Sequence, residues 1–171
     1  RLRLDEEIRE IDEGLRRSKN REQFILQQKW AIRPDDLRRA MLDHEPNIVH
    51  FSGHGVGSDG IILEGKDGLA KPVTADALKG LFELFPDVEC VLLSACFSEI
   101  QAEAIATTVK YVIGMSQAIG DQSAILFASG FYDALGASRT LSAAYKFGCN
   151  ALQLAGISEQ FTPILKTQLT S

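Results

Sequence analysis

Apolar and polar positions along this chain follow two periods, which predict helices alternating with strands. Apolar residues recur at helical spacing over 2–17, and Pro34 followed by two aspartates predicts the start of a second helix over 34–44. Uninterrupted apolar runs rich in β-branched and aromatic residues predict strands instead. The expected strands are 24–32, 47–52, 88–95, 111–115 and a short one near 163–165.

Polar residues at the starts of apolar stretches predict four more helices. They are expected from Thr74 to Phe85, from Ser98 to Ile105, from Asp121 to Gly136 and from Ser138 to about Leu154, each capped by its first residue. A glycine-rich loop over 53–60 and a short hairpin near 61–63 and 71–73 follow the strand 47–52. Strands that alternate with helices predict an α/β fold with a mostly parallel central sheet.

The bulk composition narrows the range of partners and functions that this chain can have. The 171 residues carry a net charge of -5, and an acidic chain is a poor partner for nucleic acid. No apolar run approaches the roughly 18 residues that would span a membrane. The three cysteines are too few for a disulfide scaffold, which favours a reducing compartment and predicts a cytoplasmic protein. We expect a single domain over residues 1–171, with no nucleic-acid or membrane partner.

Two of the apolar runs end in residues that can do chemistry. The run 48–52 is followed by His54, and the run 91–95 is followed by Cys96. Neighbouring parallel strands present their carboxyl ends at one edge of a sheet, where ligands bind in open α/β folds. A nearby imidazole makes a thiolate accessible near neutral pH. The pattern therefore predicts that His54 and Cys96 act as a base and a nucleophile on one edge of the sheet.

Simpler roles exist for each of these residues. Taken alone, Cys96 is compatible with a small core residue and His54 with an ordinary loop histidine. Cys90 and Cys149 lie within a predicted strand and a predicted helix, where a core role fits better. His50 lies inside a strand, which favours a structural hydrogen bond.

Cofactor signals in the sequence are weak. The loop matches G-x-G-x-x-G at 55–60. A dinucleotide site would require a helix directly after this motif, but an apolar run that predicts a strand follows it. His50, His54 and Cys96 lack the paired spacing of a zinc site. We therefore expect no cofactor and no metal.

The segments around the pair resemble a known family. Ser52-Gly53-His54-Gly55 and Leu93-Ser94-Ala95-Cys96 are similar to the His-Gly and Cys boxes of the caspase-like cysteine peptidases. The longer context resembles the CHAT domain, a bacterial branch related to caspases and separase. The segments that carry this resemblance are 3–7, 50–55, 96–99, 111–116 and 131–136.

The resemblance implies a caspase-like three-layer α/β sandwich and a cysteine endopeptidase that acts on a protein substrate. It assigns the catalytic pair to His54 and Cys96, and oxyanion stabilisation to the backbone N–H groups of Gly55 and Cys96. No third orienting side chain is evident, so the pair is a dyad. In separase-like relatives an acidic residue near the position of Asp121 contributes to a pocket for a basic side chain, which implies cleavage after Arg or Lys. Helix capping is the competing role for Asp121.

Two features depart from the family pattern. Ala95 precedes Cys96, where metacaspases carry an acidic residue, so their specificity is not implied. The family fold begins with a strand before its first helix, and none precedes Arg1 here. We therefore expect a larger protein, with an apolar strand immediately before Arg1 and regulatory domains or partners upstream. The alternative functions are a non-catalytic caspase-like docking module and a nucleotide-binding flavodoxin-like domain.

Overall fold

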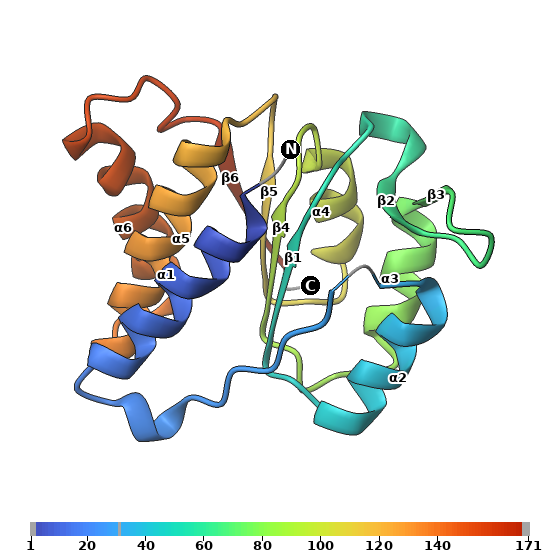
Figure 1. Ribbon diagram of the computed structural model, residues 1–171, viewed down its shortest axis with the longest axis horizontal. Coiled ribbons are helices and arrows are strands. Elements are labelled where there is room, and N and C mark those ends of the chain that lie inside the picture. The colour runs from blue at the N-terminus through green and yellow to red at the C-terminus, as the bar shows by residue number, and fades with distance from the viewer. Residues whose placement is uncertain (1–2, 31, 169–171) are drawn as a thin grey trace. The chain divides into compact units, whose positions relative to one another are not determined.

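The computed structural model describes residues 3–30 and 32–168, and these residues form two compact units. One unit, the helical unit, comprises residues 3–26 and 119–163. The other, the sheet unit, comprises 27–118 and 164–168, with the gap at 31. Figure 1 shows the helices and strands of both units with the labels used below.

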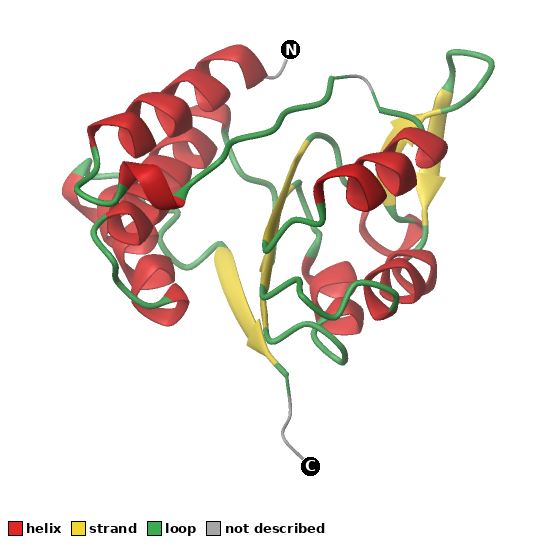
Figure 2. Cartoon of the chain, turned by 90° about the horizontal axis from the view of Figure 1, so that it is seen from below, coloured by secondary structure: helices red, strands yellow, loops and turns green. Residues whose placement is uncertain are grey.

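A four-stranded sheet in the order β1-β4-β5-β6 is the centre of the sheet unit. β1 (Ile48–Ser52), β4 (Cys90–Ser94) and β5 (Tyr111–Met115) run parallel to one another. β6 (Pro163–Thr167) begins at the boundary with the helical unit. The N–H of Gln168 donates to the carbonyl of Lys110, so the end of β6 lies beside the start of β5 and the two strands are antiparallel. Figure 2 shows β6 as the yellow strand nearest the C label. The expected α/β class with a mostly parallel sheet is confirmed.

Three helices of the sheet unit cover one face of this sheet (Figure 1). They are α2 (Pro34–His44), α3 (Ala75–Glu83) and α4 (Glu99–Ile105). Alternate residues of β4 face them, because successive side chains of a strand point to opposite faces. Val91 and Leu93 therefore share a buried cluster with Met41 of α2, Phe82 of α3 and Ile105 of α4. This cluster fixes α4, the helix that follows Cys96, against the sheet.

A small hairpin stands apart from the main sheet within the same unit. It pairs β2 (Ile61–Glu64) with β3 (Ala70–Val73) in antiparallel register. The loop between β1 and β2 contains the short 3-10 helix η2 (Gly57–Asp59). Thr74 then caps α3 as expected, since its hydroxyl accepts from the N–H of Ala77 at 3.2 Å. The hairpin therefore holds the far end of the loop that starts at the end of β1.

Three helices make up most of the helical unit: α1 (Leu4–Arg17), α5 (Asp121–Gly136) and α6 (Leu141–Leu154) (Figure 1). A short 3-10 helix, η1 (Arg21–Gln23), follows α1. α5 and α6 approach closely at two glycines. A Cβ on Gly130 would lie 2.7 Å from the carbonyl oxygen of Phe147, and one on Gly148 would lie 2.5 Å from the Phe127 ring. A larger residue at either position would push these two helices apart.

The prediction of a strand at 24–32 is wrong. The described part of this segment is largely exposed, irregular chain after η1, and residue 31 lies outside the described residues. The described part of the run belongs to neither sheet, and a strand is stable only when its backbone groups are paired. The Ile32 carbonyl instead accepts a hydrogen bond from the N–H of Glu64 at the end of β2.

Two predicted helix caps are also wrong. Gly120, not Asp121, occupies the N-cap position of α5, and Thr140, not Ser138, caps α6. The Thr140 hydroxyl accepts from the N–H of Ala143 at 3.1 Å, whereas Ser138 adopts a left-handed conformation at φ 63°. Both errors shift a helix start by one or more residues, because several small polar residues compete for each cap.

Candidate active site

Matched strand ends bring the segments of His54 and Cys96 to the same edge of the sheet. β1 and β4 are parallel neighbours, and Ser52 is in register with Ser94. His54 and Cys96 each follow two residues beyond this pair. The N–H of Gly53 also donates to the carbonyl of Ser94 at 3.2 Å, which extends the pairing past the end of β1. Neighbouring strands lie about 4.8 Å apart, so the two chain segments leave the sheet side by side.

The backbones of these two segments touch beyond the strands. A Cβ built on Gly55 would lie 2.2 Å from the carbonyl oxygen of Cys96 and 3.3 Å from the Cβ of Ala95. Only a residue without a side chain fits there, because the obstructing atom belongs to the backbone. The glycine after His54 therefore allows its loop to lie directly against the turn that carries Cys96.

The two side chains that could do chemistry reach the solvent, unlike the residues of the core. His54 is exposed and Cys96 is half-buried. Phe97, the residue after Cys96, adopts a left-handed conformation at φ 56° and remains 49% exposed. Its N–H donates to the carbonyl of Gln117 at 3.3 Å. A bulky residue in this conformation is uncommon and strained, and such strain gathers at functional sites.

The buried side chain of Ser98 fixes the turn after Cys96. Its hydroxyl is fully buried, donates to the carbonyl of Leu93 at 3.1 Å and accepts from the N–H of Met115 at 3.0 Å. Ser98 occupies the N-cap position of α4 as expected, but makes no side-chain capping bond to that helix. The hydroxyl instead joins the ends of β4 and β5, which is a fold-level contact that the local sequence does not show.

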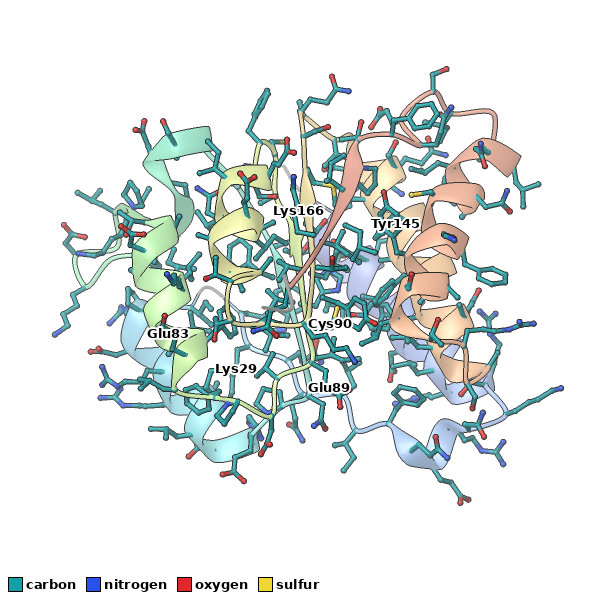
Figure 3. All side chains as sticks on the ribbon, turned by 180° about the vertical axis from the view of Figure 1, so that it is seen from behind. Lys29, Glu83, Glu89, Cys90, Tyr145 and Lys166 are labelled. Atoms are coloured by element: carbon teal, nitrogen blue, oxygen red, sulfur yellow. The ribbon has the colours of Figure 1, made fainter. Side chains whose placement is uncertain are left out.

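Burial disfavours the thiolate form of the other two cysteines. Cys90 lies at the start of β4 with no exposed surface, next to Glu89 (Figure 3). Burial, and secondarily the negative charge of Glu89, raises the pKa of the Cys90 thiol to about 12. Burial also raises the pKa of Cys149 in α6. The thiolate is the reactive form, so neither is ready for chemistry near neutral pH.

Asp121 is the first residue of α5 in the helical unit, where it is half-buried. Its charge contributes to raising the pKa of Arg3, after the larger contributions of the Glu6 hydrogen bond and charge. Because Gly120 holds the cap position, capping does not account for this aspartate. His50 lies inside β1, in register with Leu92, which agrees with a structural role.

Sequence reasoning missed Gln101, Phe97 and the two-sided role of Ser98. Gln101 lies on the same buried face of α4 as Ala102 and Ile105. A polar side chain on the apolar face of a short helix was the signal available in the sequence. The part of the chain that the structure describes contains no group of three metal-ligating side chains, and none of its helices has the length and apolarity to cross a membrane.

Comparison with known proteins places this chain in a family. The CHAT domain matches residues 3–146, so the chain belongs to the CHAT domain family, as its sequence predicted. A Roc-COR-CHAT protease from an unknown prokaryotic organism is 28% identical over 132 residues, covering 73% of this chain. A probable protease from Gillisia limnaea (strain DSM 15749 / LMG 21470 / R-8282) is 23% identical over 155 residues, covering 88% of this chain.

A solved structure shares the fold. A secreted C11 cysteine protease from Bacteroides thetaiotaomicron, determined with an irreversible peptide inhibitor, superposes with a TM-score of 0.50 and 16% identity. The match covers 74% of this chain and 41% of that protein. The matched regions amount to 12% of the Roc-COR-CHAT protease and 27% of the Gillisia protein. This chain therefore has the fold of a caspase-like cysteine protease and spans a small part of its relatives.

Proposed function

We propose that this chain is a cysteine endopeptidase domain that cleaves a protein substrate with a Cys96–His54 dyad. The observation that carries the proposal is the register of β1 on β4, with the Gly55 backbone seated against Cys96. These contacts bring a half-buried thiol and an exposed imidazole to adjoining segments. The protease names of two relatives and the fold of a cysteine protease support the same activity.

The reaction follows from the chemistry of the two side chains. The Cys96 sulfur attacks the scissile carbonyl carbon, and His54 takes up the thiol proton. His54 then gives this proton to the leaving amine as the carbon–nitrogen bond breaks, which leaves an acyl group on the sulfur. Water, deprotonated by His54, attacks the acyl carbon and releases the carboxylic acid product. The thiol regains its proton at the end of the cycle.

The tetrahedral oxyanion needs hydrogen-bond donors. We assign this role to the backbone N–H groups of Gly55 and Cys96, because the Gly55–Cys96 contact holds these two backbones together. Loss of one such donor typically lowers kcat by about 10²–10³. The donors belong to the backbone and not to side chains that rotate, so they need no change of rotamer as charge develops.

Specificity and control are finer parts of the same proposal. Asp121 is the candidate for recognising Arg or Lys before the cut, by the resemblance to separase-like relatives, and it lies half-buried at the start of α5. Control by domains or partners upstream of Arg1 agrees with the name of the Roc-COR-CHAT relative, which includes other domains. A reducing, cytoplasmic setting stays a prediction from the cysteine content.

The test compares the wild-type protein with Cys96→Ala and His54→Ala on a peptide library. Cleavage by the wild type and its loss in both variants is the expected result. Circular dichroism checks that the variants fold, and Cys149→Ala serves as a matched control that retains activity. If the wild type cleaves nothing, and iodoacetamide modifies Cys96 no faster than Cys149, the alternative of a non-catalytic docking module replaces the peptidase.

A further inference from the structure

A buried amide links the helix after Cys96 to the loop after His54. Gln101 lies on α4 with no exposed surface, and its Nε2 donates to the carbonyl of Gly57 at 2.7 Å. Gly57 opens η2, three residues after His54. The bond therefore spans the two segments that the dyad needs in a fixed relation.

The cost of burying Gln101 points to a role other than stability. Its Oε1 is buried and has no hydrogen-bond partner among the described residues. Burying a polar atom without a partner is unfavourable, and an apolar side chain of similar size would avoid that loss. The neighbours on this helix face, Ala102 and Ile105, are apolar and fully buried. A glutamine at this position is thus less stabilising than an apolar side chain would be, but it provides one directed hydrogen bond.

α4 is a suitable reference for such a bond because its start is anchored. Ser98 bonds to the ends of β4 and β5, and a Cβ on Gly114 of β5 would lie 2.7 Å from the Cβ of Ala102. The helix is therefore packed tightly on the sheet directly after Cys96. Gln101 extends this fixed position to the glycine-rich loop.

Gln101 ties Gly57 to α4, while the backbone hydrogen bonds of the loop run to the hairpin or within the loop. The His54 carbonyl is bonded to the N–H of Ile62, which secures the side of the loop next to the hairpin. Within the loop, backbone bonds join Val56 to Gly60 and Gly60 to Gly57, so they close the loop on itself without attaching it to α4. Gly57 has φ 62°, a conformation that favours glycine and leaves this part of the chain adaptable.

We propose that Gln101 is a positioning residue that holds the His54 loop against the Cys96 turn, and so sets how closely the imidazole approaches the thiol. This inference rests on the proposed peptidase function. Gln101 itself touches no reacting atom, since it acts through the carbonyl of Gly57. Its loss should loosen the loop and reduce the activation of Cys96, while the fold remains intact.

The experiment compares Gln101→Met with Ile105→Val in the protein. Met keeps the length of the side chain but removes the donor. Ile105→Val removes a methyl group from the same buried helix face without touching the loop. Hydrogen exchange at Val56, Asp59 and Gly60 reports on the loop. The pH dependence of Cys96 alkylation by iodoacetamide, resolved by mass spectrometry, reports on the thiol.

In Gln101→Met, exchange in the loop should become about tenfold faster, the factor expected for one lost hydrogen bond. Alkylation of Cys96 should slow at neutral pH and its profile should move to higher pH. With a cleavable peptide, kcat should fall while KM stays nearly constant. Ile105→Val should change none of these, although the loss of a buried methyl group lowers its melting temperature.

Loop exchange or alkylation equal to the wild type in Gln101→Met, or matched by Ile105→Val, would overturn the positioning role. The wild type alone tests the proposed function. If its Cys96 reacts no faster than Cys149, the peptidase proposal fails and the positioning role fails with it. If the wild-type thiol is activated and Gln101→Met leaves it so, only the inference about Gln101 is wrong.

Discussion

Gly55 lies so close to Cys96 that a single added methyl group would sit 2.2 Å from the Cys96 carbonyl oxygen. This contact joins the loop of the proposed base to the turn of the proposed nucleophile. It depends on the register of β1 and β4, which brings both segments to the same height on the sheet. The first prediction follows directly from it.

Gly55→Ala should nearly abolish peptide cleavage and destabilise the protein by about 1–3 kcal/mol, the usual effect of overpacking. The new Cβ must push the loop away from Cys96, because the obstructing atom is backbone. Urea denaturation and peptide hydrolysis measure the two effects. Gly80→Ala is the matched control, since a Cβ on Gly80 meets nothing within 4 Å and alanine favours its helix, α3. Full activity in Gly55→Ala would contradict the close contact.

Ser98→Ala should lower the free energy of unfolding by about 1–3 kcal/mol, because the buried N–H of Met115 loses its acceptor. Cleavage should slow as well, since the turn carrying Cys96 loses its connection to β4 and β5. Thr107→Ala is the control: its hydroxyl bonds to the carbonyl of Ala104 at an exposed position, so its removal should matter little. Equal stabilities of the two variants would be inconsistent with the role assigned to Ser98.

Stability should fall at alkaline pH because of Cys90. Its pKa is about 12 in the folded chain against a reference value of 9.0, so the folded state keeps a proton that the unfolded state loses in this range. The contribution of the protonated Cys90 thiol to the free energy of unfolding is therefore complete below pH 9.0 and is lost as pH rises toward 12. The slope of this loss is about 1.4 kcal/mol per pH unit.

Cys90→Ala removes the titrating group and should remove this slope, whichever way it changes stability at neutral pH. Denaturant unfolding between pH 8 and 11 measures the difference between wild type and variant. Lysine and tyrosine titrations affect both proteins alike and cancel. Parallel stability curves for the wild type and Cys90→Ala would show that the buried thiol is not the cause.

Phe97→Asn should leave the fold intact or slightly more stable, and lower kcat/KM. Asparagine tolerates the left-handed conformation at φ 56° better than phenylalanine, whose side chain is 49% exposed and so loses less burial than a core aromatic residue would. The expected loss is in substrate binding, since an exposed ring beside Cys96 is placed to contact an apolar substrate side chain. Phe82→Asn, a fully core aromatic in the same unit, should unfold the protein instead. A severe loss of stability in Phe97→Asn would mean that the ring serves the fold.

Asp121→Asn should reduce cleavage after Arg and Lys relative to other residues, because the substitution removes the negative charge and keeps the shape. A peptide library with all residue types before the cut measures this preference. Gly120 caps α5, so the melting temperature should hardly change. Cleavage after apolar or acidic residues that is unaltered by the substitution would reject the specificity role.

Local patterns in the sequence were enough to predict most helices and strands. The apolar runs at 47–52, 88–95 and 111–115 became β1, β4 and β5. β4 and most of β5 are buried, as parallel strands covered on both faces are, whereas β1 is half-buried. The same runs placed His54 and Cys96 just beyond two strand ends. Thr74 capped its helix as predicted, since a cap requires only its own neighbours.

Tertiary structure decided the features that depend on residues far apart in the chain. Whether 24–32 forms a strand depends on pairing along its length, and its described residues belong to neither sheet. The burial of Cys90, the two bonds of Ser98 and the bond from Gln101 to Gly57 likewise require segments brought together by the sheet. The sequence by itself determined which residues could do chemistry, because side-chain type and strand pattern are local. Only the fold decided which of these residues are held together, because strand register and packing depend on residues far apart in the chain.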